Sequence, residues 1–197
     1  MDHSLMAGFL RRLLPLLWLG ACPGAGWAAE FVLDASHTSI HFAVSHFDIS
    51  LVRGRIAKIT GTVQFDPDAK TGAVDLRIDP DAIDTGDRTL DQILRSDQFL
   101  DTAQTGDARY GSSRFVFDGD KLAAIEGTLI LRGIARPVRL VAQRFTCKDV
   151  KAGIILRHVC GGEFQATIKR RDFGMTRFLP DVGDQVELLI SVEATRQ

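Results

Sequence analysis

The sequence contains little that would mark a nucleic-acid-binding or a membrane-spanning protein. Lys and Arg number 24 against 25 Asp and Glu, the formal net charge is −1, and both signs are interspersed along the chain. This balance argues against a nucleic-acid partner and against a polybasic membrane surface. The apolar run over residues 13–19 is under half of the roughly 20 residues that a helix needs to cross a bilayer. We therefore expect no transmembrane segment in the mature protein.

The sequence also lacks the parts of a catalytic site. It has no nucleophile elbow, no free Cys beside a His and no isolated pair of carboxylates on an apolar strand, which are the usual elements of acyl transfer and hydrolysis. Residues 172–174 spell Asp-Phe-Gly, but no glycine-rich loop or catalytic-loop motif of a kinase accompanies them. We expect no catalytic residues, no cofactor and no enzymatic activity.

The first 28 residues have the composition of a secretory signal peptide. Arg11 and Arg12 precede the apolar run, which gives way to small residues through Ala29, the order that a signal peptide requires. We expect cleavage after Ala28 and one domain over residues 29–197, located in the periplasm or secreted. As an alternative, residues 19–22 resemble a lipobox that ends at Cys22, and the protein would then be a lipoprotein anchored through that residue.

Cysteine is scarce, and the three residues have different expected roles. Cys22 falls within the leader, which leaves Cys147 and Cys160 in the mature chain. In an oxidising export compartment such a pair is expected to form a disulfide. Two independent buried thiols are the alternative.

Almost every segment after Glu30 alternates apolar and polar residues, which places one face of a strand inside and the other in water. Turn sequences, for example at residues 118–120 and 132–133, separate these segments. About eight strands must hide their inner face and their edges, and a closed barrel does both. We therefore expect an all-β fold, an extended antiparallel β-barrel. One short helix over residues 89–96, with Leu90, Ile93 and Leu94 at helical spacing, is predicted as a cap over a barrel mouth.

A barrel of about eight strands is filled by its own side chains or holds one small ligand. Gly61, Gly127 and Ala166 are small residues at inward-facing positions, and they favour a cavity, although a glycine can equally mark a bend in a strand. The residues predicted to line that cavity lie on the inward faces of the strands, with Phe173 as a plug: Ile40, Phe42, Val44, Ile59, Val63, Leu76, Ile78, Phe115, Phe117, Leu129, Leu131, Leu140, Phe164, Ala166, Ile168, Phe173, Leu188 and Ile190.

Several short blocks, in order along the chain after Glu30, resemble the YceI-like family of polyisoprenoid-binding proteins. They lie at residues 31–42, 52–55, 61–67, 83–87, 94–101, 127–129, 136–138, 171–175 and 182–184. The resemblance implies a lipocalin-like barrel, export and often a homodimer. It also implies that a polyisoprenoid, an isoprenoid quinone or a fatty amide binds in a central tunnel. The chain departs from the family in its Cys147 and Cys160 pair and in residues 107–114, which lack the usual Tyr-Pro step.

These observations together predict an envelope protein that carries or sequesters a long-chain isoprenoid or quinone lipid, with a homodimer as a possible assembly. An envelope stress or adhesion module with a side-chain-filled barrel is the alternative. His37 and His41 would lie about 13 Å apart on a strand, and His46 has the opposite parity, so no metal site is expected. The candidates for holding a lipid head group are polar residues near the mouth blocks, with ordinary structural or solvated roles as the alternative: His37, His46, Arg53, Arg55, Arg88 and Arg95.

Overall fold

The structure is a computed structural model, and it describes residues 28–197 of the chain. The expected signal peptide over residues 1–28, together with the alternative lipidation site at Cys22, falls almost wholly outside this described part. Within it, no helix is both long enough and apolar enough to span a bilayer.

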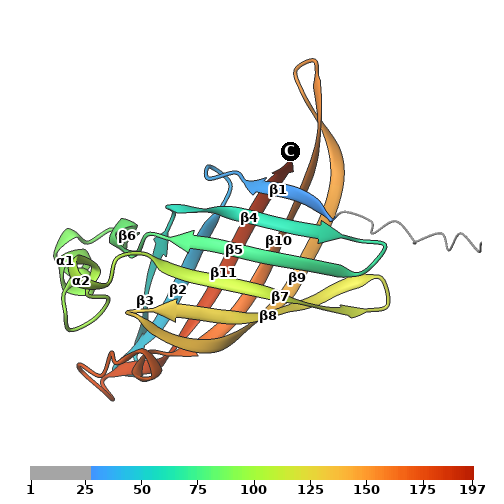
Figure 1. The fold of residues 1–197 in the computed structure, drawn as a ribbon. Helices are drawn as coiled ribbons and strands as arrows, with labels where there is room; N and C mark the ends of the chain where they lie inside the picture. The colour runs from blue at the N-terminus through green and yellow to red at the C-terminus, as the bar shows by residue number, and fades with distance from the viewer. Residues whose placement is uncertain (1–27) are drawn as a thin grey trace, which may run out of the picture.

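The described chain is built mainly of antiparallel strands (Figure 1). The strands are β1 (Ala29–Leu33), β2 (Ser39–His46), β3 (Ser50–Ile56), β4 (Ile59–Asp66), β5 (Thr71–Ile78), β6 (Ile83–Asp84), β7 (Ala108–Asp118), β8 (Lys121–Leu131), β9 (Ile134–Ala152), β10 (Ile155–Lys169) and β11 (Val182–Arg196). The helices are short: α1 (Arg88–Arg95), α2 (Thr102–Thr105) and two 3-10 turns, η1 (Pro80–Ala82) and η2 (Arg170–Phe173).

Eight of these strands close into a ring, which confirms the predicted barrel. The ring runs β1, β4, β5, β7, β8, β9, β10 and β11, and β1 closes it by pairing with β4 on one side and β11 on the other. Every strand pair is antiparallel. The alternation of apolar and polar residues gives the barrel its apolar inner face and polar outer face. In β5, for example, Val74, Leu76 and Ile78 are buried, whereas Asp75 and Arg77 are exposed.

The barrel divides at one end, because β11 has two different neighbours on the same edge. Its second half pairs with β1, at Ala194 opposite Leu33, whereas its first half pairs with β2, at Val186 opposite Val44. Strands β3 and β6 continue outward from β2. The short branch β2–β3–β6 therefore forms one wall of the barrel at this end only, near helices α1 and α2 (Figure 1).

Helix α1 confirms the predicted helix within one residue at each end. Asp87 caps it by accepting hydrogen bonds from the Thr89 and Leu90 amides at 2.8 and 3.3 Å. The buried carboxylate of Asp91 accepts from the amide and hydroxyl of Thr85 at 2.8 and 2.7 Å, so the loop before the helix is fixed to it. The one-turn helix α2 was not expected, since its Thr-Ala-Gln-Thr sequence has no apolar periodicity.

Two of the three small residues expected to open space in the barrel have other roles. The Tyr110 ring covers Gly127, where an added Cβ would lie 2.6 Å from that ring. At Gly61, φ is +148° and an added Cβ would lie 2.1 Å from the Asp75 carbonyl oxygen, so glycine permits a close backbone approach there. Ala166 is the third, and it is partly buried against the core.

The buried Tyr110 side chain of β7 links strands β8 and β9 through its hydroxyl, and we expect this phenol to resist ionisation. Its hydroxyl lies 3.1 Å from the Ile125 carbonyl and 3.2 Å from the Val138 carbonyl. Burial raises the pKa of the Tyr110 phenol above its usual value, and the charge of Glu126 adds to the increase. Because the neutral phenol is preferred in the folded state, its contribution to stability is complete below about pH 10 and is lost as the pH rises further.

Tyr110 is the only tyrosine of the chain, so an absorbance titration reads it directly. We expect no phenolate signal from the folded barrel near pH 10, and a normal titration at about that pH in urea. A Tyr110→Phe variant supplies the blank. Phenolate absorbance at about pH 10 with an unchanged circular dichroism spectrum would contradict the buried, hydrogen-bonded position of the Tyr110 phenol.

Candidate ligand cavity

A cavity of about 520 Å³ occupies the end of the barrel where the branch β2–β3–β6 separates from the ring. Its volume lies within the roughly 300–1,000 Å³ of typical small-molecule sites. Its polar lining residues are His46, Asp87, Thr89 and Arg170. The others are apolar: Ile40, Phe42, Val44, Val52, Ile56, Ile78, Pro80, Ile83, Leu90, Ile93, Leu94, Phe99, Leu100, Ala108, Leu129, Leu131, Ile168, Met175, Phe178, Val182, Val186 and Leu188.

Part of the predicted lining set comes together in this large cavity. It consists of residues from β2, β5, β8, β10 and β11, namely Ile40, Phe42, Val44, Ile78, Leu129, Leu131, Ile168 and Leu188. Helix α1 adds Leu90, Ile93 and Leu94, in agreement with its expected place over a barrel mouth.

A second cavity, of about 60 Å³, lies further along the barrel and is lined by aliphatic side chains and phenylalanine rings. Phe65 is central to it, with ring centroids 5.9 Å from Phe115 and 5.3 Å from Phe145. Another part of the predicted set lines this space: Val63, Leu76, Phe115, Leu140, Phe164 and Ile190. The barrel interior is therefore wide at the branched end and nearly filled at the other.

Four residues of the predicted set line neither cavity. Ile59 and Phe173 are 2% and 1% exposed and pack within the core, so Phe173 is core packing beside the tight αL turn at Gly174. Phe117 stacks near Phe65 at 6.4 Å. Ala166 lies on β10 between Phe164 of the small cavity and Ile168 of the large one.

The sequence pattern missed the lining contributed by β3 and by the loops. Val52 and Ile56 alternate with exposed arginines on β3 and face the large cavity, and this alternation was a signal that could have found them. Phe99, Met175 and Phe178 come from irregular segments, in which no periodicity reports the direction of a side chain.

Arg170 is a charged residue in the cavity wall that no sequence pattern indicates. It is 3% exposed, and its guanidinium donates hydrogen bonds to the carbonyls of Met175, Val182 and Gly183 at 2.7–2.9 Å. The Cζ atom of Arg170 lies 5.8 Å from the centroid of the Phe99 ring, over its face. Burial lowers the pKa of Arg170 from its usual value. In the sequence it stands beside Arg171, which is exposed, and the pair looks like an ordinary solvated turn.

The two predicted head-group histidines lie at opposite ends of β2, which spans about 25 Å. His46 lines the large cavity. His37 is exposed in the loop before β2, where its Nδ1 lies 2.9 Å from a carboxylate oxygen of Asp34. The Ser36 hydroxyl and then the His37 ring hold the pKa of Asp34 well below its usual value, and Asp34 in turn raises the pKa of His37. His37 is therefore part of a surface turn and does not meet the large cavity.

The four predicted head-group arginines do not line the cavity either. Arg53 and Arg55 are exposed on the outer face of β3, opposite its cavity-facing residues, and Arg88 is exposed at the start of α1. Arg95 has a structural role, since it donates to the carbonyls of Asp81 and Ile83, both at 2.8 Å. These hydrogen bonds join α1 to η1 and β6.

Comparison with known proteins identifies the family. A model described as the YceI-like domain matches residues 31–194. The chain belongs to the YceI-like family. A UPF0312 protein of Pseudomonas aeruginosa is 32% identical over 194 residues, which cover 95% of this chain and all of that protein.

Solved structures resemble this fold as well. Burkholderia cenocepacia BcnA has a TM-score of 0.65 and 20% identity over 83% of this chain and 99% of its own. A polyisoprenoid binding domain from Saccharophagus degradans has a TM-score of 0.61 and 19% identity over 86% of this chain and 99% of its own. At such identities the likeness shows a shared fold.

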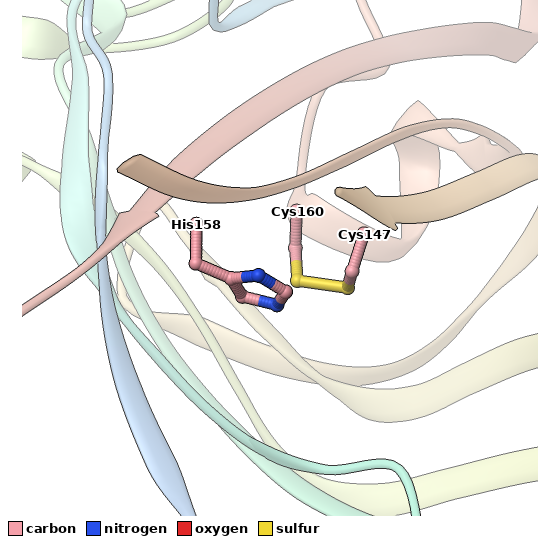
Figure 2. Close-up of side chains that lie close together, drawn as sticks. All are labelled: Cys147, His158 and Cys160. Atoms are coloured by element: carbon pink, nitrogen blue, oxygen red, sulfur yellow. A yellow bond between two sulfur atoms is a disulfide. The ribbon is translucent and has the colours of Figure 1, made fainter. Parts of the chain in front are cut away.

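The cysteine pair of this YceI-like barrel forms the predicted disulfide. Cys147 of β9 and Cys160 of β10 lie directly opposite each other and are bonded. His158 lies beside them on β10 (Figure 2), and its Nδ1 is 2.8 Å from a carboxylate oxygen of Asp149. The two sulfurs and a ring nitrogen of His158 lie within 4.8 Å of one another, but the disulfide occupies both sulfurs.

Proposed function

We propose that this YceI-like protein holds one long apolar lipid, of the polyisoprenoid or isoprenoid quinone class, in its large cavity and carries it through the cell envelope unchanged. The observation that carries the proposal is the cavity of about 520 Å³ with an almost wholly apolar lining. The name of the Saccharophagus degradans relative, a polyisoprenoid binding domain, agrees with this ligand class.

The chemistry of the lining supports binding without a reaction. Each methylene that leaves water contributes about 0.8 kcal/mol, so the apolar tail supplies most of the affinity. His46, Asp87 and Thr89 are the polar groups available to a head group. Arg170 offers less, since its donors are directed at three backbone carbonyls. A cavity of this volume argues against the alternative function, which requires a barrel filled by its own side chains.

Native mass spectrometry of the purified full chain tests the proposal. We expect a co-purifying species that leaves on denaturation and whose mass fits an isoprenoid lipid. The same spectrum gives the masses of the subunit and of the assembly, and so tests the predicted leader cleavage and the predicted homodimer. A ligand-free protein that also takes up no added polyprenyl phosphate or ubiquinone would contradict the carrier function.

A further inference from the structure

The hairpin of β9 and β10 extends beyond the barrel. Strand β10 last pairs with β11 at Val159, opposite Thr195, and β9 last pairs with β8 at Val141. Residues 149–158 of the hairpin therefore pair only with each other, from His158 opposite Asp149 to Ile155 opposite Ala152. Figure 1 shows this two-stranded arm, in orange, projecting away from the ring. It lies at the opposite end of β11 from the branch that encloses the large cavity.

The tip of this arm exposes three consecutive large apolar residues. Ile154 is 102% exposed, Ile155 53% and Leu156 63%. Consecutive exposed apolar residues are unfavourable in a soluble fold unless they contact something. They lie on both faces of the ribbon, since neighbouring residues of a strand point to opposite faces, and so the barrel cannot cover them by folding the arm down on one face.

Three cations lie along the arm between its base and its apolar tip. Lys148, Lys151 and Arg157 are exposed, and Lys151 stands opposite Leu156 and Arg157 opposite Val150. Within residues 28–197, none of these three cations lies within 4 Å of a carboxylate oxygen. The nearby acid Asp149 is engaged by His158. The arm therefore combines an apolar tip with unpaired positive charge.

We propose that the β9–β10 arm docks the protein on an anionic membrane surface, with residues 154–156 inserted among the lipids and the three cations at the headgroup level. Apolar insertion and attraction of cations to anionic lipids are the two contributions that give reversible interfacial binding. The long side chains of Lys151 and Arg157 can lie along the apolar surface while their charges stay in the headgroup layer. A protein partner is disfavoured because three tip residues offer far less than the roughly 800 Å² per partner of a stable interface.

The disulfide supports the same interpretation. Cys147 and Cys160 join the two strands at the base of the arm, one residue pair inside Lys148 and Val159 (Figure 2). A two-stranded ribbon is only marginally stable in water, and a covalent link at its base restricts fraying where the neighbouring strands end. The arm can therefore project from the barrel as an ordered element.

Flotation of the delipidated full-length protein with vesicles tests this proposal. We expect binding to phosphatidylcholine vesicles that contain phosphatidylglycerol, weakening with added salt, and little binding to phosphatidylcholine alone. Replacing residues 154–156 by Ser, or Lys148, Lys151 and Arg157 by Gln, should each reduce binding at least about tenfold. The matched control replaces Phe47, Ile49 and Leu51 by Ser, since these are 55%, 87% and 43% exposed at the other end of the barrel; it should bind as the parent does.

Three results would overturn the proposal: unchanged binding of both arm variants, an equal loss in the control, or loss of a dimer in place of vesicle binding when residues 154–156 are replaced. Unfolding curves in urea establish that every variant is folded. Flotation uses delipidated protein. Membrane docking by the arm can therefore fail while lipid binding in the cavity holds, and lipid binding can fail while docking holds.

Discussion

Replacing Val44 by Trp is expected to weaken binding of an isoprenoid lipid about 30-fold while the barrel stays folded. Val44 lies on β2 and lines the large cavity, so an added indole takes up volume that the lipid tail would fill. Exclusion of two or three methylenes removes about 2 kcal/mol of binding free energy. The larger ring enters open space, and the strain that follows overpacking of a filled core should be absent.

His41→Trp is the matched control for this prediction. His41 lies on the same strand but is exposed on the outer face, so its replacement should leave lipid affinity unchanged. Both tryptophans of the chain, Trp18 and Trp27, precede residue 28, so protein produced without the leader reports the new indole alone. Its emission should be shifted to the blue in Val44→Trp and should respond to added ubiquinone.

A filled core at Val44 would give the opposite result. Lipid uptake would be unchanged in Val44→Trp, and the melting temperature of the delipidated protein would fall, as overpacking of a solid core by about 1–3 kcal/mol requires. Delipidated protein is needed for the melt because bound lipid itself stabilises the folded state.

Arg170→Met is expected to lower the free energy of unfolding by about 3–5 kcal/mol, a large share of the total for a single domain. Met has a similar length and fills the space, but it leaves the carbonyls of Met175, Val182 and Gly183 without their donor. Each buried carbonyl without a partner costs about 1–3 kcal/mol, partly relieved by water. Urea unfolding followed by circular dichroism gives the value.

Two further variants separate this explanation from a general effect of charge. Arg171→Met removes the neighbouring cation, which is exposed and lies 2.7 Å from a carboxylate oxygen of Asp184, and should cost at most about 1 kcal/mol. Arg170→Lys keeps the charge but not the planar set of donors, and should recover only part of the loss. Equal effects of Arg170→Met and Arg171→Met would show that the three carbonyls do not depend on Arg170.

The sequence by itself determined the all-β class, the approximate number of ring strands, helix α1 and the disulfide. Each of these follows from local information: alternation states which side chains share a face, helical spacing identifies α1, and Cys147 and Cys160 are the two cysteines outside the expected leader. The closed barrel follows from the need of about eight strands to hide their edges, and the family resemblance implies it as well.

Only the tertiary structure decided where the interior is empty. Alternation places Phe117 and Val44 on inward faces alike, but Phe117 stacks near Phe65 whereas Val44 faces a cavity. The difference arises because β11 exchanges β1 for β2 along its length, and no local pattern encodes that change of partner. His46 ends β2 at the cavity, whereas His37 lies in the loop before the other end of that strand.

Charge shows the same division between local sequence and folded position. Composition averages the whole chain to a net charge of −1, and this balance conceals both the unpaired cations of the β9–β10 arm and the buried guanidinium of Arg170. A side chain's energy depends on the groups that surround it after folding. For Arg170 those groups are three carbonyls 5–13 residues away in the chain, so its role became visible only when the turn after η2 was in place.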